Sequence, residues 1–257
     1  MRLYFVRHGQ STNNLLFDQT GQYDGRVSDP ELTETGQAQA KAVAAWLRDG
    51  DRGADRVSTT RNADMPMPTN EKRPGGVGAF GVTHLYTSLM TRAMATADAI
   101  SAALGLRPVG LVDAFEMGGL YLMNAETGVQ QPEPGKGRTA ITARFPRMVL
   151  PASVGEEGWH AGRPYEVPAD RPARARRVLD SLLAAHPEGD CVVLVSHGEF
   201  FKHFLAATLN APTFEQAWIA MNNCAVARFD FLGDRHAPFV DVGFINRAHF
   251  MPAHLLT

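Results

Sequence analysis

Apolar residues along this chain fall into two alternating patterns: short β-rich runs, and longer segments in which apolar positions recur every three or four residues. The short runs predict strands, and the run at 191–195 is apolar throughout, as in a strand buried on both faces. The longer segments predict helices, since Ala93, Ala97 and Ile100, for example, share one helical face. Predicted strands occupy residues 2–6, 83–86, 108–112, 191–195, 224–231 and 239–245, and predicted helices occupy residues 33–48, 90–104, 170–185 and a segment around Phe200 and Phe204.

Alternating strands and helices favour a parallel sheet that is covered by helices. We therefore predict an α/β fold, a three-layer α/β/α sandwich with a mostly parallel sheet, built as a single domain over residues 1–257. Two irregular stretches interrupt it. Residues 50–81 predict a long surface insertion, and residues 117–168 predict a cap over one end of the sheet. The polar segment that follows the first strand, up to Pro30, is predicted as a loop.

Composition excludes several classes of protein. The chain has 257 residues, 44% of them hydrophobic and 20% charged, which is typical of a globular protein. Its net charge of −2 argues against nucleic acid as a partner. No apolar run approaches the ~20 residues of a membrane span, and the apolar run before Arg7 is too short for a signal peptide, so we expect no membrane partner and a cytoplasmic location. The two cysteines are too few for a cysteine-based metal site.

Candidate chemistry lies directly after the predicted strands. His8 follows the first strand and His197 follows the strand at 191–195, and each is succeeded by a glycine that lets the backbone approach a ligand. Ligands of open α/β sheets bind beyond the carboxyl ends of the strands. Arg7 precedes the first histidine, and Arg92 lies near the first turn of its predicted helix, where free N–H groups also favour anions. These residue types suit transfer of a phosphoryl group.

A third predicted strand is followed by two carboxylates, Asp113 and Glu116. A carboxylic acid beside a phosphoryl site can protonate the leaving oxygen and later accept a proton from water. The pattern leaves open which of the two does so.

Four motifs resemble those of the histidine phosphatase superfamily, which includes the cofactor-dependent phosphoglycerate mutases. The motif at residues 7–14 is similar to the family's Arg-His-Gly signature, and residues 32–40 are similar to its Leu-Thr-x-x-Gly-x-x-Gln-Ala. Residues 87–97 are similar to Thr-Ser-x-x-x-Arg-Ala-x-x-Thr-Ala, and residues 196–198 match the late His-Gly. The motifs follow the family order over most of the chain, so the resemblance implies a phosphoglycerate mutase-like fold.

The resemblance also implies roles for individual residues. His8 would be the nucleophile and would form a phosphohistidine, while Arg7, Arg92 and His197 would bind the transferring phosphoryl group. Glu116 would be the general acid. Substrate-binding contacts would come from Ser11, Asn14 and Gly198. No metal and no cofactor are implied, because the cations of the chain stabilise the charge on the phosphoryl oxygens.

Two departures from the family pattern shape the predicted function. The acid region lacks the later Glu-Gly of many members, which keeps Asp113 as a rival to Glu116. The mutase-type Glu-x-His-Tyr-Gly stretch is also missing, which favours hydrolysis. We therefore predict a metal-independent phosphomonoesterase of the histidine acid phosphatase type, acting on a small-molecule phosphomonoester. The alternatives are a phosphoglycerate-mutase-type isomerase and a non-catalytic phosphate-binding module.

Several residues also have a structural interpretation. Ser11 and Asn14 would then only shape their loop through hydrogen bonds to the backbone. The arginines at 171, 174 and 177 would form a solvated helix face, and Trp159 and Tyr165 would anchor a small core of the cap.

Overall fold

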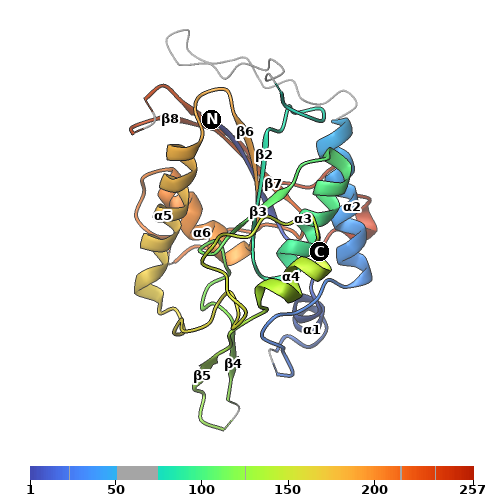
Figure 1. The fold of residues 1–257 in the computed structure, drawn as a ribbon, viewed down its shortest axis with the longest axis vertical. Coiled ribbons are helices and arrows are strands. Elements are labelled where there is room, and N and C mark those ends of the chain that lie inside the picture. Colours follow the sequence, from blue (N-terminus) through green and yellow to red (C-terminus); the bar gives the residue numbers. More distant parts are fainter. Residues whose placement is uncertain (23, 51–74, 125, 215, 235) are drawn as a thin grey trace.

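The computed structural model describes residues 1–22, 24–50, 75–124, 126–214, 216–234 and 236–257. A six-stranded sheet forms its centre, in the order β3-β2-β6-β1-β7-β8 (Figure 1). Its strands are β1 (Arg2–Arg7), β2 (His84–Ser88), β3 (Pro108–Leu111), β6 (Cys191–Ser196), β7 (Val226–Leu232) and β8 (Phe239–Arg247). The sequence predicted all six within a few residues of their ends.

Strands β3, β2, β6 and β1 are parallel, and β7 and β8 add an antiparallel edge. The predicted mostly parallel sheet is therefore confirmed. β6 pairs with β2 on one side and β1 on the other, and all six of its residues are buried. This arrangement brings the carboxyl ends of β1, β2 and β6 together at one end of the sheet, opposite the N-terminus of the chain (Figure 1).

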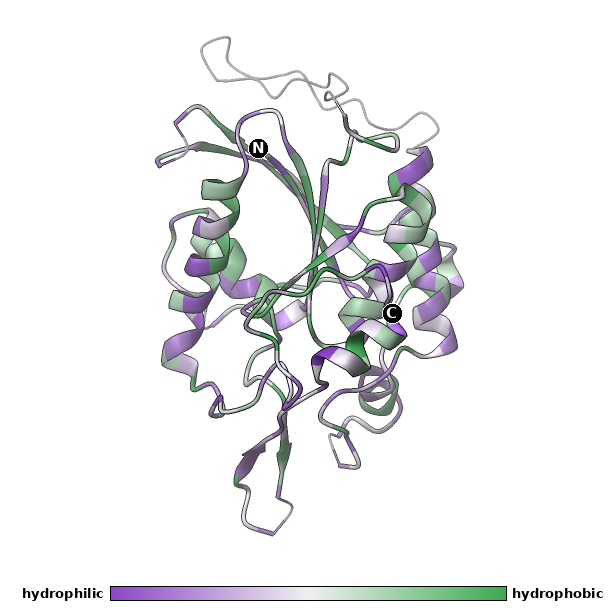
Figure 2. Ribbon diagram, viewed as in Figure 1, coloured by the Kyte–Doolittle hydropathy of each residue, from purple (hydrophilic) through white to green (hydrophobic). Residues whose placement is uncertain are grey.

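Helices cover both faces of the sheet, as the three-layer prediction requires. α2 and α3 pack together on one face, and α5 and α6 pack together on the other (Figure 1). Hydrophobic residues line the sides of the helices that face the sheet, and hydrophilic residues gather on the outer sides (Figure 2). The helices are α2 (Glu34–Asp49), α3 (Thr91–Leu104), α5 (Arg171–Ala185) and α6 (Gly198–Thr208).

Aromatic side chains fill the space between the sheet and each helical layer. On one face Tyr4 contacts Trp46, with ring centroids 6.2 Å apart. On the other face Phe5 packs on Phe201 and Phe204, with ring centroids 4.9 and 5.4 Å apart. Neighbouring residues of β1 thus point to opposite layers, which is the period-two alternation of a strand buried on both sides.

The segment predicted as a loop before Pro30 contains a helix, so that prediction was wrong. α1 (Thr12–Thr20) begins after Ser11, whose hydroxyl accepts the backbone N–H of Asn14, and ends at Gly21 in a left-handed conformation. None of its residues is buried, so the sequence has no apolar stripe to mark it. Its capping box stabilises it instead.

The predicted cap holds more regular structure than the sequence indicated. It contains the hairpin β4 (Tyr121–Met123) and β5 (Gln130–Pro132) and the short helix α4 (Arg138–Arg144), at the end of the molecule where the parallel strands stop (Figure 1). Trp159 lies in a small second core, as one interpretation of the sequence proposed, but the cap shares that core with Leu89, Met90 and Met94 at the start of α3. Tyr165 packs edge-on against Tyr121. No described helix is long and apolar enough to span a bilayer.

Two smaller predictions concern the long insertion and the N-terminal cap of α5. Residues 51–74 of the predicted insertion lie outside the described residues, and Val77 pairs with Val82 in a short turn at its end. Asp170 was expected to cap α5, but its side chain makes no capping hydrogen bond, because the backbone there already turns in the short 3-10 helix 168–170.

Close backbone packing at Gly36 yields a stability prediction. A Cβ atom at Gly36 would lie 2.1 Å from the carbonyl oxygen of Gln10, so the loop after β1 and the start of α2 would have to separate. We expect Gly36→Ala to lower the free energy of unfolding by about 1–3 kcal/mol, measured by urea denaturation. Gln37→Ala, at the exposed neighbouring position, is the control. Equal stability of the two variants would contradict the packing.

Candidate active site

Three neighbouring strand ends deliver the histidines and arginines singled out from the sequence. Arg7 ends β1 and His8 follows it, His197 follows β6, and Arg92 lies in the first turn of α3, which follows β2. The imidazole rings of His8 and His197 are 5.1 Å apart between centroids. All four side chains are therefore brought together at the carboxyl ends of the strands, where ligands of α/β sheets bind.

The hydrogen bonds of His8 fix its tautomer. Its Nδ1 lies 2.7 Å from the carbonyl oxygen of Gly9, which can only accept, so Nδ1 carries the proton. Nε2 is then unprotonated and accepts a hydrogen bond of 3.0 Å from Nε of Arg92. The Nε2 lone pair is thus directed toward a guanidinium. An anion held by Arg92 would lie beside the nitrogen atom that can attack it.

His197 presents the complementary nitrogen. Its Nε2 is 2.8 Å from the hydroxyl of Ser88, which also accepts the backbone N–H of Met90. The Ser88 hydroxyl can donate its hydrogen to Nε2, and in that tautomer the proton of His197 is on Nδ1. Nδ1 is buried and has no hydrogen-bond partner among the described residues. A buried donor of this kind is expected to serve a ligand.

Arg7 provides a second unused donor. Its Nη1 donates to the carbonyl oxygen of Met221 over 2.5 Å, which anchors the guanidinium, while its Nε is buried without a partner among the described residues. Gly198, the first residue of α6, lies against this side chain. A Cβ there would come within 3.3 Å of Nε of Arg7. Gly198 thus gives the guanidinium room at the site, and a direct contact of Gly198 with substrate stays a prediction.

Burial and positive charge keep both histidines neutral. Desolvation, followed by the charges of Arg92 and Arg7, lowers the pKa of His8 well below the usual 6.5. The pKa of His197 is also lowered, by burial first and then by Arg92 and His8. Neutral imidazole is the nucleophilic form, so the environment favours attack by His8 at neutral and mildly acidic pH.

This electrostatic arrangement predicts how His8 titrates. We expect His8 to stay neutral as the pH falls through 6.5, the value of an unperturbed imidazole, and Arg92→Gln to raise its pKa because a nearby positive charge is lost. Because unfolding restores the ordinary pKa, the unfolded state binds the extra proton, and folding stability should decline as the pH falls below about 6.5. Nuclear magnetic resonance of the histidine ring protons measures the pKa directly. A His8 pKa at or above 6.5 in the native chain would contradict the burial of a neutral ring.

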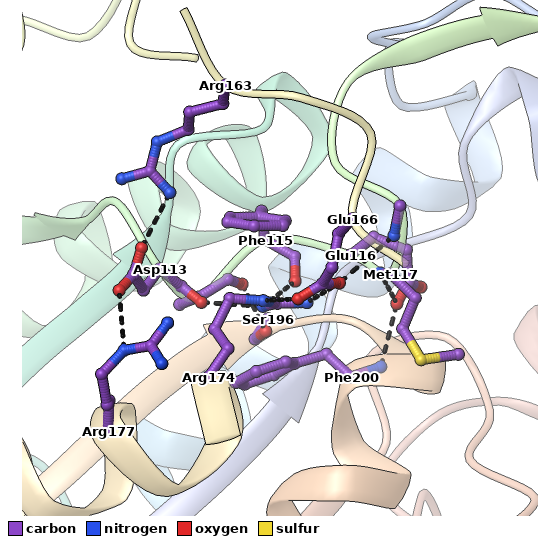
Figure 3. Close-up of polar contacts among 12 residues, drawn as sticks. Asp113, Phe115, Glu116, Met117, Arg163, Glu166, Arg174, Arg177, Ser196 and Phe200 are labelled. Carbon is purple, nitrogen blue, oxygen red and sulfur yellow. Dashed lines mark hydrogen bonds and ion pairs between the residues drawn. The ribbon is translucent and has the colours of Figure 1, made fainter. Parts of the chain in front are cut away.

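The two candidate acids lie in different surroundings. One carboxylate oxygen of Glu116 accepts the backbone N–H groups of Met117 and Phe200 over 3.0 and 2.9 Å, at the start of α6 beside His197 (Figure 3). Burial lowers the pKa of Arg7 and of Arg92, and the Glu116 charge is the largest influence in the opposite direction. This common influence places Glu116 near both guanidiniums.

Asp113 is occupied by ion pairs instead. Its carboxylate lies 2.9 Å from Nη1 of Arg163 and 3.8 Å from Nε of Arg177, which brace it between the cap and α5 (Figure 3). Glu116 therefore has the better position for a proton donor, and its role stays a prediction.

Ser11 and Asn14 are engaged with each other. The Asn14 side-chain oxygen accepts the backbone N–H and the hydroxyl of Ser11 over 3.0 and 2.9 Å, and the Ser11 hydroxyl accepts the Asn14 N–H. These bonds form the capping box of α1 and support the loop-shaping interpretation. The Asn14 side-chain NH2 group could still donate to a ligand, so its binding role remains open.

Comparison with known proteins identifies the family of this chain. The family model of the histidine phosphatase superfamily (branch 1) matches residues 3–63 and 77–239. This chain belongs to the histidine phosphatase superfamily. The family predicted from the four sequence motifs is thereby confirmed.

Relatives of this superfamily member carry two kinds of name. The probable phosphoglycerate mutase GpmB of Yersinia enterocolitica is 26% identical over 257 residues, covering 99% of this chain and 95% of the relative. Among solved structures, a mycobacterial glucosyl-3-phosphoglycerate phosphatase is 21% identical with a TM-score of 0.57, covering 96% of this chain and 99% of the other. The phosphoserine phosphatase of Entamoeba histolytica is 19% identical with a TM-score of 0.55, covering 97% and 98%. The structural likenesses support the fold.

The sequence did not predict one buried ion pair of this superfamily member. Arg174 of α5 was expected on a solvated face, yet it is 2% exposed and pairs with Glu166 through bonds of 2.5 and 2.7 Å (Figure 3). Its Nη1 donates to the carbonyl oxygens of Asp113 and Phe115, both over 2.8 Å. Arg174 thus holds the loop that carries Glu116 through hydrogen bonds to its backbone, and we call this contact the Arg174 clamp. The signal was present, because Arg174 is four residues before the buried Val178 on the same helix face.

Loss of this clamp should destabilise the cap. We expect Arg174→Met to cost about 3–5 kcal/mol of unfolding free energy, because Glu166 is left buried without its partner. The double variant Arg174→Met with Glu166→Leu should recover part of that loss. Chemical denaturation gives both values, and Arg177→Met, on the exposed side of the same helix, is the matched control. A loss no larger than that of the control would contradict the buried pair.

Two charged residues that the sequence did not single out, Asp29 and Lys136, also support the site. Asp29 accepts the backbone N–H and the hydroxyl of Thr91 over 2.8 and 2.5 Å, and so caps the helix on which Arg92 lies. Lys136 of the cap donates to Asp29 over 3.0 Å and to Thr91 over 2.6 Å. This cluster ties the cap to the helix start that positions Arg92. A charged residue in a loop carries no sequence signal for such a contact.

Proposed function

We propose that this chain is a phosphomonoester hydrolase that acts through a phosphohistidine on His8. The observation that supports it most is the unprotonated Nε2 of His8, held at 3.0 Å from Nε of Arg92. Two further buried donors, Nε of Arg7 and Nδ1 of His197, have no partner among the described residues. Together they offer a nucleophile and a set of donors to one phosphoryl group.

The first step forms a nitrogen–phosphorus bond. Nε2 of His8 attacks phosphorus with its lone pair, and the bond from phosphorus to the ester oxygen breaks, with the electron pair leaving on that oxygen. Arg7, Arg92 and His197 stabilise the charge on the three equatorial oxygens. The Gly9 carbonyl oxygen accepts a hydrogen bond from Nδ1–H throughout and so stabilises the positive charge that develops on the ring.

Glu116 supplies the proton that the leaving oxygen needs. In the second step the same carboxylate removes a proton from water, whose oxygen attacks phosphorus and releases phosphate from His8. Neutral His8 is then regenerated. The positive charge of Arg26 acts on Arg92 and so lies near the site, where it favours anionic substrates.

A mutase is the second candidate, because the Yersinia relative bears the name of a probable phosphoglycerate mutase. A mutase would use the same nucleophile and would return the phosphoryl group to another hydroxyl of the substrate. The missing mutase-type stretch favours transfer to water.

A panel of phosphomonoesters tests the proposal. We expect release of inorganic phosphate from at least one member, without added metal or cofactor, and no relocation of phosphate on 3-phosphoglycerate. Relocation without release would establish the mutase. Binding of phosphate esters without release or relocation over the whole panel would establish a non-catalytic binding module.

A further inference from the structure

Three potential metal ligands meet at the opposite end of the sheet from His8. His84 begins β2, Asp190 directly precedes β6, and His186 directly follows α5. β2 and β6 are neighbours in the sheet, so both loops emerge at the amino ends of the parallel strands (Figure 1). The length of β2 separates this cluster from Ser88 at the phosphoryl site, about 13 Å at the usual rise of a strand. No role in the proposed phosphatase reaction involves it.

The three side chains are close enough to share one ion. Nδ1 of His186 lies 2.8 Å from Oδ2 of Asp190, and Nδ1 of His84 lies 3.7 Å from the same oxygen. One ligand atom of each residue lies within 4.8 Å of the other two, the one such group among the described residues. Ligand atoms around a tetrahedral zinc ion are about 3.3 Å apart, given bonds of about 2.0–2.1 Å. Shifts of about an ångström would therefore seat an ion.

The surrounding structure holds the ligands in place. The backbone N–H and hydroxyl of Thr83 both donate to the carbonyl oxygen of Cys191, which ties the residues beside His84 and Asp190 together. Nε2 of His186 lies 2.9 Å from the Tyr86 hydroxyl. With a metal on Nδ1, Nε2 of His186 would carry the proton and donate a hydrogen bond to the Tyr86 hydroxyl. Metal-ligating histidines usually make such an outer hydrogen bond.

The cluster is also accessible from solvent. The side chain of His84 is 44% exposed and that of Asp190 is 23% exposed, whereas that of His186 is 3% exposed. The site is thus closed on the side of His186 and open to solvent on the side of His84, where an ion could enter.

We propose that His84, His186 and Asp190 form a binding site for one divalent cation of the zinc class. Two imidazoles and one carboxylate are ligands that zinc, iron, nickel and copper ions accept, and magnesium and calcium ions prefer oxygen ligands alone. Water would complete the coordination on the exposed side. Without metal, the hydrogen bond between His186 and Asp190 also joins the end of α5 to the start of β6. The experiment distinguishes this purely structural contact, a hydrogen-bonded staple, from a metal site.

Isothermal titration of the untagged full chain with Zn²⁺ tests the site, with Mg²⁺ as the comparison ion. We expect one equivalent of Zn²⁺ to bind and the apparent melting temperature to rise with Zn²⁺ concentration. His84→Ala and Asp190→Asn should each weaken binding at least ~10-fold. His84 is chosen over His186 because its exposed ring contributes little to packing. His254→Ala, which removes an exposed histidine elsewhere, should bind as the native chain does.

Two results of the Zn²⁺ titration would overturn the proposal. The cluster would be only a hydrogen-bonded staple if no saturable Zn²⁺ binding occurs, or if binding is the same in native chain, His84→Ala and Asp190→Asn. The melting temperature without metal checks that each variant is folded. This test does not depend on phosphatase activity.

Discussion

Replacement of His8 by alanine should lower turnover of a phosphomonoester by at least ~10⁴-fold, the scale seen when a catalytic nucleophile is removed. The reason is that no other described nitrogen combines an unprotonated lone pair with a guanidinium at 3.0 Å, as Nε2 of His8 does beside Arg92. Initial rates of phosphate release at saturating substrate measure the loss. Binding of inorganic phosphate should persist, because Arg7, Arg92 and His197 remain.

Two controls make this result specific. His254→Ala removes an exposed histidine and should retain full turnover, and circular dichroism should show the native fold for both variants. The His8→Ala loss should appear in kcat. If His8→Ala retained turnover, the nucleophile assignment would be wrong, whatever the substrate.

Replacement of Glu116 by glutamine should lower kcat by about 10²–10⁴-fold on an alkyl phosphate, because the leaving oxygen then departs without a proton. The loss should be much smaller on p-nitrophenyl phosphate, whose leaving oxygen is stable as an anion. Both strong backbone hydrogen bonds to Glu116 end on one oxygen, which the glutamine amide oxygen can replace, so the start of α6 should stay intact. Parallel kinetics on the two substrates measure the difference.

The contrast between substrates separates a proton donor from a merely structural carboxylate. Glu157→Gln, at an exposed position of the cap, is the matched control and should leave both rates unchanged. An equal loss on both substrates would contradict the role of general acid. Asp113→Asn should then be tested in the same way.

The sequence was sufficient to predict the α/β fold and the meeting of the site residues at one end of the sheet, for a physical reason. β6 is apolar at five consecutive positions and sits between β1 and β2, so its burial fixes the order of the central strands. Once these strands are parallel neighbours, the residues that follow them must share one end of the sheet. That is why His8 and His197, 189 positions apart in the chain, could be expected to meet.

Other features were missed because they have no apolar periodicity or because a charged side chain outweighed it. α1 buries no side chain, so its capping box was its only signal and was overlooked. Arg174 was assigned to solvent by its charge, although its helix position is that of a core residue and Glu166 neutralises it. The contacts of Asp29 and Lys136 join loops that are distant in sequence, and only the folded chain reveals them.

The most direct test of the account is to identify the phosphorylated residue. The full chain is mixed with a ³²P-labelled phosphomonoester, quenched rapidly in base, and digested for peptide mass spectrometry. We expect a base-stable, acid-labile label on His8, and no label in His8→Ala. A label on any other residue, or steady turnover with no labelled protein at any quench time, would contradict it.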